Sequence, residues 1–422
     1  MQSLPFFHSY DPVQKWLRLR GASYLPEELL ACRDEIEVLD VNDGTLTELP
    51  DWLPELSRLR IVFGSNNLFE EVPPVLAECS NLYMAGFKSC RISTFAEDSL
   101  PKSLVWLVLT DNTLKELPHS IGELSHLKKV SLAGNQLFYL PEEMQLCTEI
   151  EFLRLSANAF TQEPAEWVFS LPKLAWYGDA GNPFSDVRDA GSVQEYSWDA
   201  FRVGELLGES PSSEVFAAVS PSGEQVALKL YRGELTSDGF PRDDMRAALV
   251  AGRHAQLIQL LGRVTDGPDG RQGLVLERVP DSFTALGLPP SLSTNSRDVY
   301  PDSATFSSSV VTRVLQSVAE AAVHLHSRGV SHGDLYAHNI LVDPQGTARL
   351  GDFGAASLYD GSSGSFREAL DVRAFGYLME ELLQRSSSMA KLSELKDACL
   401  VEDGSARPSF YEILGALEEF TG

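Results

Sequence analysis

The chain has 422 residues and carries 34 Lys and Arg against 60 Asp and Glu, which gives a formal net charge of −26. Hydrophobic residues make up 43% and charged residues 22%, proportions that exclude collagen-like, low-complexity and wholly disordered chains. Because an acidic chain repels phosphate backbones and anionic lipid heads, we expect no nucleic-acid partner and no binding to membrane surfaces. At roughly 100–200 residues per domain, the length predicts two or three domains.

The five cysteines are scattered and show no CxxC spacing, which argues against a disulfide framework and against a zinc site. No run approaches the ~18 consecutive apolar residues of a transmembrane helix, so we expect no membrane span. The N-terminus lacks the basic and then apolar regions of a secretory signal. The sequence therefore predicts a soluble protein that is cytoplasmic or otherwise intracellular.

The first half of the chain repeats one pattern at intervals of 22 to 24 residues. In one copy, Leu127, Val130 and Leu132 precede Asn135, and a Leu-Pro step follows. The pattern resembles the leucine-rich repeat, and this resemblance implies a short strand before each Asn, whose side chain bonds backbone groups that the strand leaves unpaired. The successive copies place Gly44, Asn66, Cys90, Asn112, Asn135, Asn158 and Asn182 in this column.

The resemblance to the leucine-rich repeat implies an α/β solenoid of about seven repeats over residues 36–184, preceded by an N-terminal cap at residues 1–35. Within the cap, residues 10–33 are expected to be helical and to cover the open face of the first repeat. Arrays of this kind bind partner proteins on the concave face that the strands form.

Three aromatic residues, Trp106, Phe152 and Trp176, occupy the strand position that points to the concave face. Exposed aromatic clusters often mark an interface. We therefore predict a groove for a protein partner, and a partner with a basic surface because the chain is acidic. The alternative, equally open, is that the second half of the chain or a cap covers these side chains within the same molecule.

A polar linker at residues 185–199 leads to a segment of alternating strands and glycine turns, over residues 200–422. Short motifs follow there in a fixed order. Lys229 ends the run Val-Ala-Leu-Lys, His332–Asn339 reads His-Gly-Asp-Leu-Tyr-Ala-His-Asn, and Asp352–Gly354 reads Asp-Phe-Gly. Each motif alone is weakly specific, whereas the ordered set is strongly so.

The ordered set resembles a eukaryotic-type protein kinase, which implies an α+β fold of two lobes with ATP and Mg²⁺ as cofactors. The resemblance implies that Lys229 holds the ATP phosphates and that Asp334 accepts or orients the hydroxyl proton, so that these two residues are catalytic. Asn339 and Asp352 would hold Mg²⁺. The implied ATP-binding residues are Gly208, Val215, Ala227, Lys229, Glu277 and Val279, and the implied supporting residues are Asp244, His332, Phe353, Gly354 and Arg407.

The glycine loop and the helix acid depart from the family's pattern. Only Gly208 remains of the loop, because Ser210 and Ser213 stand at the next two glycine positions, where a side chain hinders close approach to phosphate. The helix that follows Lys229 should supply a glutamate to pair with it. Spacing indicates Asp244, with the neighbouring Asp243 and Met245 as alternatives.

The segment after the second motif departs as well. Gly333 replaces an arginine that normally binds an activation-loop phosphate, which argues against that mode of switching. The segment from Asp352 to Asp371 is short and contains no Ala-Pro-Glu, so we consider Glu368 as a substitute acid that pairs with Arg407.

These features predict a soluble kinase that transfers the ATP γ-phosphate to a protein hydroxyl, with the repeats binding a substrate or a regulator. Tyr336 and His338 leave the acceptor type open, with Ser or Thr favoured over Tyr. The serines of the glycine loop keep a pseudokinase scaffold as the first alternative. The short segment after Asp352 keeps a small-molecule kinase as the second.

Overall fold

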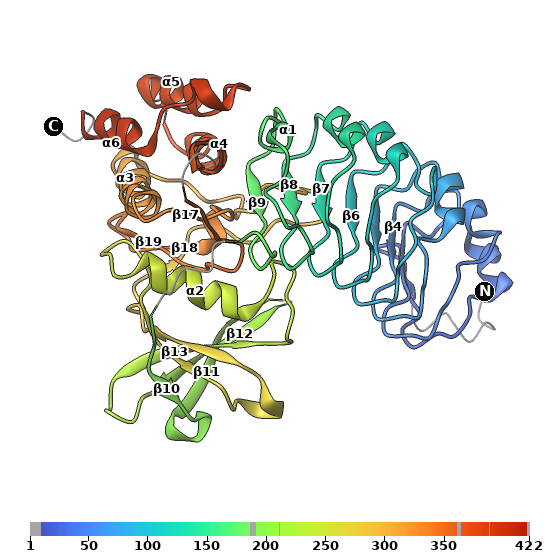
Figure 1. Ribbon diagram of the computed structural model, residues 1–422, viewed down its shortest axis with the longest axis horizontal. Coiled ribbons are helices and arrows are strands. Elements are labelled where there is room, and N and C mark those ends of the chain that lie inside the picture. The colour runs from blue at the N-terminus through green and yellow to red at the C-terminus, as the bar shows by residue number, and fades with distance from the viewer. Residues whose placement is uncertain (1–9, 186–190, 211, 361–363, 388, 420–422) are drawn as a thin grey trace. The chain divides into compact units, whose positions relative to one another are not determined.

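The computed structural model describes residues 10–185, 191–210, 212–360, 364–387 and 389–419. The chain divides into two compact units, drawn together in Figure 1. The first comprises Met1–Lys173 with Asn182–Phe184, and the second comprises Leu174–Gly181 with Ser185–Gly422. The division differs from the expected domain boundaries at one place, since Leu174–Gly181 belongs to the second unit. The predicted linker at residues 185–199 is described only in part.

Short parallel strands form the first unit's sheet, side by side in Figure 1. They pair in one register, so that the first residue of each strand lies opposite the first residue of the next. The central side chains, such as Leu39, Val62 and Leu153, are fully buried. The sheet is compatible with the predicted repeats. The strands are β3 (Val38–Asp40), β4 (Ile61–Phe63), β5 (Met84–Gly86), β6 (Trp106–Val108), β7 (Lys129–Ser131) and β8 (Phe152–Arg154).

Short helices lie in the returns between strands, except between β5 and β6, and most of these helices begin at or just after a proline, which has no N–H to leave unpaired. Each of the 3-10 helices buries one apolar side chain, and these side chains are Leu53, Leu76, Ile121 and Met144. The helices are η3 (Leu53–Glu55), η4 (Pro74–Glu78), η5 (His119–Glu123), η6 (Glu142–Leu146) and α1 (Glu166–Phe169).

A ladder of buried asparagines fixes the turns after the strands. Asn135, for example, accepts a hydrogen bond from the N–H of Leu114 at 3.0 Å and donates to the carbonyls of Leu109 and Leu132. The second predicted member was wrong by one residue. Asn67, not Asn66, makes the equivalent buried bonds, because Asn66 lies exposed in the left-handed conformation.

The N-terminal cap is not the helix that we expected over residues 10–33. Its described part begins with two antiparallel strands, β1 (Tyr10–Asp11) and β2 (Trp16–Arg18), and β2 pairs in parallel with β3. Among the described residues of the cap, helical structure is confined to the 3-10 helix η2 (Glu27–Cys32). Trp16 and Leu17 therefore lie in a strand that extends the sheet, where the backbone groups of that strand find hydrogen-bond partners.

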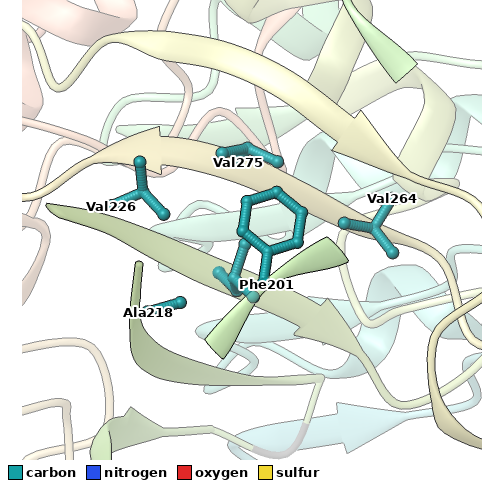
Figure 2. Packing of buried hydrophobic residues seen from close by; sticks show 6 residues of the cluster. Phe201, Ala218, Val226, Val264 and Val275 are labelled. Carbon is teal, nitrogen blue, oxygen red and sulfur yellow. The ribbon is translucent and has the colours of Figure 1, made fainter. Parts of the chain in front are cut away.

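The second unit contains a curled, largely antiparallel sheet with the strand order β10-β14-β15-β13-β12-β11. Figure 2 shows its buried core, in which Phe201 lies among Ala218, Val226, Val264 and Val275. The helix α2 (Pro241–Ala251) follows β13. The strands are β10 (Glu195–Tyr196), β11 (Arg202–Glu209), β12 (Ser213–Val219), β13 (Gln225–Tyr231), β14 (Leu260–Val264) and β15 (Gly273–Glu277).

The rest of the second unit is mostly helical. Its helices are α3 (Ser308–His326), α4 (Gly364–Leu383), α5 (Ala390–Cys399) and α6 (Phe410–Glu418), with 3-10 turns η7 (Trp198–Ala200), η8 (Pro268–Gly270), η9 (Ala337–Asn339) and η11 (Gly404–Ala406). Short strands flank them: β9 (Trp176–Gly178), β16 (Thr284–Ala285), β17 (Val330–Ser331), β18 (Ile340–Val342), β19 (Ala348–Leu350) and β20 (Ser357–Leu358). Within the described part of the chain, no helix combines the length and the apolarity needed to cross a bilayer.

Candidate functional site

Lys229 lies at the centre of the site. The strand β13 carries it between neighbouring strands, and its side chain is only 9% exposed. Its Nζ donates to Asp244 Oδ2 on α2 and to Asp352 Oδ1, both at 2.8 Å. Asp244 also accepts the hydroxyl of Tyr231 at 2.5 Å. The structure thus brings Lys229 to Asp244, and the adjacent Asp243 instead lies 3.4 Å from Arg246.

The charges in this cluster stabilise one another. Burial alone would lower the pKa of Lys229, but Asp244 and Asp352 outweigh burial and raise that pKa. Burial likewise raises the pKa of Asp352, and Lys229 more than compensates, so the pKa of this carboxyl falls to about 2. Lys229 and Asp352 are therefore both charged at neutral pH, as a site that holds anionic phosphate and a cation requires.

The Asp-Phe-Gly turn presents Asp352 to the site. Asp352 has a φ of 60°, and the N–H of Gly354 donates to its Oδ1 at 3.1 Å. Phe353 is buried with its ring centroid 5.6 Å from that of His332. The side chain of Asp352 is 46% exposed, so part of the carboxylate faces open space.

The helix α4 fixes the loop from His332 to Asn339 through the carboxylate of Asp371. Asp371 accepts the N–H of His332 at 2.8 Å and the N–H of Gly333 at 2.9 Å. Asn339 Nδ2 donates to the carboxylate of Asp334 at 2.8 Å and to its carbonyl at 2.9 Å. The predicted residues Lys229, Asp244, Asp334, Asp352 and Gly354 line one pocket, together with Ser212, Tyr231, Thr236, Asp238, Phe240, Pro241 and Ala355.

The other predicted nucleotide contacts lie on the adjacent sheet. Val215 on β12 faces Lys229 across the strand pair, and Ala227 on β13 faces Leu276 on β15. Val279 follows β15 and is buried. The backbone N–H of Glu277 already donates to the carbonyl of Gln259 at 2.9 Å, and its side chain pairs with Arg349.

The serines of the altered glycine loop bond to one another. Ser210 Oγ accepts the N–H groups of Ser212 at 3.2 Å and Ser213 at 3.1 Å, and the N–H of Ser210 donates to the carbonyl of Ser213 at 2.8 Å. Gly208 lies on β11 just before this turn, with open space where a side chain would stand. The serine side chains thus close a tight turn at the end of the hairpin.

For Trp176 the alternative of coverage within the same molecule is the one observed, since it is 1% exposed and its indole packs inside the second unit. Phe152 is likewise buried, and Trp106 alone of the three aromatics is partly exposed. One expectation about a charged pair was wrong. Arg407 does not pair with Glu368. It donates to the carbonyls of Val401, Glu402 and Ala369, and Glu368 accepts the hydroxyl of Tyr359 at 2.6 Å.

Several polar residues around the site were not anticipated. Asp298, in the stretch between β15 and α3, is 4% exposed and accepts the backbone N–H of His338 at 2.9 Å and its Nδ1 at 2.7 Å. Tyr300 donates to Glu381 at 3.0 Å. The sequence signal was the cluster Arg297–Tyr300, two charged residues and an aromatic at the end of a Ser- and Pro-rich stretch.

Part of the second unit matches a known domain family. Residues 201–393 match the family model described as "Protein kinase domain". A domain of this class uses ATP and Mg²⁺. Lys229 carries a positive charge that suits phosphate, and Asp352 and Asn339 carry side-chain oxygen atoms of the kind that bind Mg²⁺.

Curated relatives point the same way. Two Arabidopsis thaliana proteins, each named Probable serine/threonine-protein kinase, are 27% identical over 166 residues (39% of this chain, 22% of the relative) and 28% identical over 202 residues (45% and 33%). The CTD kinase subunit alpha of Schizosaccharomyces pombe is 27% identical over 172 residues (40% and 27%). The aligned part of the chain thus spans a third or less of the length of these relatives.

Proposed function

We propose that the protein transfers the γ-phosphoryl group of ATP to a protein hydroxyl, with Ser or Thr as the acceptor. The single observation that carries this proposal is the buried Lys229, bonded at 2.8 Å to both Asp244 and Asp352 in the pocket that also contains Asp334. Kinase catalysis needs a fixed cation, a metal-binding carboxylate and a base within one site. The names of the curated relatives support Ser or Thr as the acceptor.

Each residue has a proposed role in phosphoryl transfer. ATP supplies the transferred group, and Mg²⁺ neutralises its developing charge. Asp352 and Asn339 offer the hard oxygen ligands that hold Mg²⁺, and Lys229 orients the α- and β-phosphates. Asp334 orients the acceptor hydroxyl and accepts its proton. Val215, Ala227 and Val279 supply apolar walls for adenine, with backbone groups at Glu277–Val279 as hydrogen-bond partners.

The supporting experiment compares phosphate incorporation into a set of proteins and peptides by the native chain and by Asp334→Ala and Lys229→Met. We expect transfer by the native chain that both substitutions abolish. Lys115→Met, which replaces an exposed lysine of the first unit, is the matched control and should transfer like the native chain. Equal, background-level incorporation by all of these proteins would contradict the proposal.

A pseudokinase scaffold is the second candidate, and the closed serine turn at Ser210–Ser213 favours it. That turn places serine hydroxyls at positions where the glycine loop of a kinase, which has no side chains there, brings its backbone close to phosphate. Thermal stabilisation of the native chain by ATP with Mg²⁺, without any transfer, would support this candidate. Transfer to metabolites but to no protein would support a small-molecule kinase, since the segment between Asp352 and Asp371 offers little platform for a protein.

We further propose that the first unit is a leucine-rich repeat array that binds a protein partner with a basic surface. The supporting feature is the strand column in which Lys129 Nζ lies 4.5 Å from the ring centres of both Trp106 and Phe152. The test is capture of a labelled basic partner, once identified, by the native chain and by Trp106→Ser. Unchanged affinity would remove Trp106 from the proposed surface.

A further inference from the structure

The segment Leu174–Gly181, hereafter the β9 segment, packs onto the loop that carries Asp334. Trp176 Nε1 donates to the carbonyl of Leu335, the residue after Asp334, at 3.2 Å. The indole stacks on Tyr336 with ring centres 4.3 Å apart and the planes 4° from parallel. The indole also stacks on Tyr377 of α4, with ring centres 5.3 Å apart. A buried aromatic of this size contributes a large apolar area to the stability of the loop.

Asp179 in the same segment forms a buried cluster with residues far along the chain. Its two carboxylate oxygens accept Arg367 Nη1 and Nη2, each at 2.8 Å, in a bidentate pair. Ser357 Oγ and Tyr177 Oη also donate to the carboxylate, each at 2.8 Å. Asp179, Ser357 and Arg367 are all 2% exposed. Bidentate pairs removed from water in this way are strong and directional, and losing one partner leaves an uncompensated charge.

The partners of Asp179 lie at two points of the activation segment, defined here as Asp352–Asp371. Ser357 opens β20, which pairs with β17 directly before the His332–Asn339 loop. Arg367 lies one helical turn before Asp371, whose carboxylate holds the N–H groups of His332 and Gly333. One carboxylate therefore links the strand after the Asp-Phe-Gly turn to the helix that holds the loop of Asp334.

The β9 segment also lies against Gly333, next to Asp334. A Cβ atom at Gly333 would lie 2.3 Å from the carbonyl oxygen of Tyr177 and 2.7 Å from that of Ala355, and its φ is 68°. The β9 segment thus occupies the space that any side chain at position 333 would need. The β9 segment can therefore pack in this place only because position 333 carries no side chain.

We propose that Asp179 is a positioning residue for phosphoryl transfer: its fixed carboxylate holds Ser357 and Arg367 in their active arrangement, so that no phosphate on the activation segment is required. This inference rests on the proposed kinase function. Asp179 acts through Ser357 and Arg367 and does not itself contact nucleotide or acceptor. The charge of a carboxylate in a bidentate pair with an arginine is what a phosphate group supplies elsewhere.

The test uses the full chain with Asp179→Asn, which keeps the shape of the side chain and removes its charge, and with Asp199→Asn as an exposed control. We expect kcat to fall at least tenfold in Asp179→Asn while KM for ATP stays within about threefold, and we expect no change in the control. Phosphatase treatment of the native chain should leave kcat unchanged. Unchanged kcat in Asp179→Asn, a rise in kcat, or a loss of kcat on phosphatase treatment would overturn the proposal.

A second readout separates this inference from the proposed function. Amide hydrogen exchange in β17 and β20 should be at least tenfold faster in Asp179→Asn than in the native chain, whether or not the protein transfers phosphate. If Asp179→Asn fails to fold, Ser357→Ala removes one of the bonds to Asp179 and should shift kcat and exchange in the same direction by a smaller factor. Unchanged exchange overturns the positioning role. A native chain no more active than Lys229→Met overturns the kinase function, and faster exchange in Asp179→Asn would then show only that Asp179 orders β17 and β20.

Discussion

The two units achieve order in different ways. In the first unit one contact recurs: Asn112, Asn135 and Asn158 each bond the same backbone groups, one repeat apart. In the second unit each decisive contact occurs at one place, as Lys229–Asp244 and Asp179–Arg367 do. We infer that a lost repeat contact reduces the stability of one turn, whereas a lost contact in the second unit removes an arrangement that no neighbour duplicates. The following predictions test this difference.

The largest effect should come from Asp244→Asn. Loss of its charge leaves Lys229 with one carboxylate partner and frees it to move from the phosphate position, so we expect kcat/KM to fall roughly 100-fold. The measurement is steady-state phosphotransfer. The matched control is Asp243→Asn, one residue earlier on α2, which should change kcat/KM less than about twofold. Equal losses in both variants would contradict the assignment of Asp244 as the partner.

Gly333→Ala should destabilise the second unit strongly. The new Cβ would overlap the carbonyl oxygens of Tyr177 and Ala355 and would hold an L residue in the left-handed conformation. We expect the free energy of unfolding to fall by about 3–5 kcal/mol in urea denaturation. Gly223→Ala is the control because Gly223 has a φ of 87° with no atom near its Cβ position, so it should cost only about 1 kcal/mol.

Asn67→Ala should destabilise the first unit, because it leaves the carbonyls of Val41 and Gly64 and the N–H of Leu46 without their partner. We expect a loss of about 2–3 kcal/mol in the transition of the first unit. Asn66→Gly keeps the left-handed turn and should cost less than about 0.5 kcal/mol. A larger loss at position 66 than at position 67 would restore the register expected from the sequence.

Glu381 should make the stability of the second unit depend on pH. Burial and the neighbouring Asp298 raise its pKa to about 7, although Tyr300 and Arg297 oppose this. The unfolded carboxyl titrates near 4.3, so between about pH 4.5 and 7 the folded state binds a proton that the unfolded state does not. Stability is therefore full below this window and is lost as the pH rises through about 7.

Glu381→Gln should flatten this decline, making the variant more stable than the native chain at pH 8 by at most about 3 kcal/mol. Glu380→Gln, the neighbouring control, should keep the native slope. Parallel stability curves for the native chain and Glu381→Gln between pH 5 and 8 would show that Glu381 does not titrate in this window.

Much of the site was predictable because its chemistry is contained in short motifs. Lys229, Asp334, Asn339 and Asp352 each lie in a contiguous run whose spacing is fixed by local backbone geometry, and the structure brings all four side chains close together. The repeat pattern likewise predicted parallel strands, since a period-dependent signal is reinforced with each copy. The shift from Asn66 to Asn67 arose in a copy where two asparagines adjoin.

The rest was not predictable for a physical reason. Asp179 and Arg367 are 188 residues apart, and Asp298 and His338 are 40 apart, in stretches without periodicity. A contact made once between distant residues leaves no pattern in a single sequence. Trp176 matched the repeat pattern, which left open whether a partner or the same molecule covers it, and its segment packs within the second unit. Sequence periodicity indicates which face a residue lies on, and tertiary contacts decide whether that face is covered.

We propose above that the pocket of Lys229, Asp334 and Asp352 transfers phosphate. The most direct measurement is incorporation of the labelled γ-phosphate of ATP into protein by the full chain with Mg²⁺, compared with Asp334→Asn and with the native chain in EDTA. We expect incorporation by the native chain with Mg²⁺, reduced at least roughly 100-fold in the variant and in EDTA. Incorporation that is the same in all three samples would contradict it.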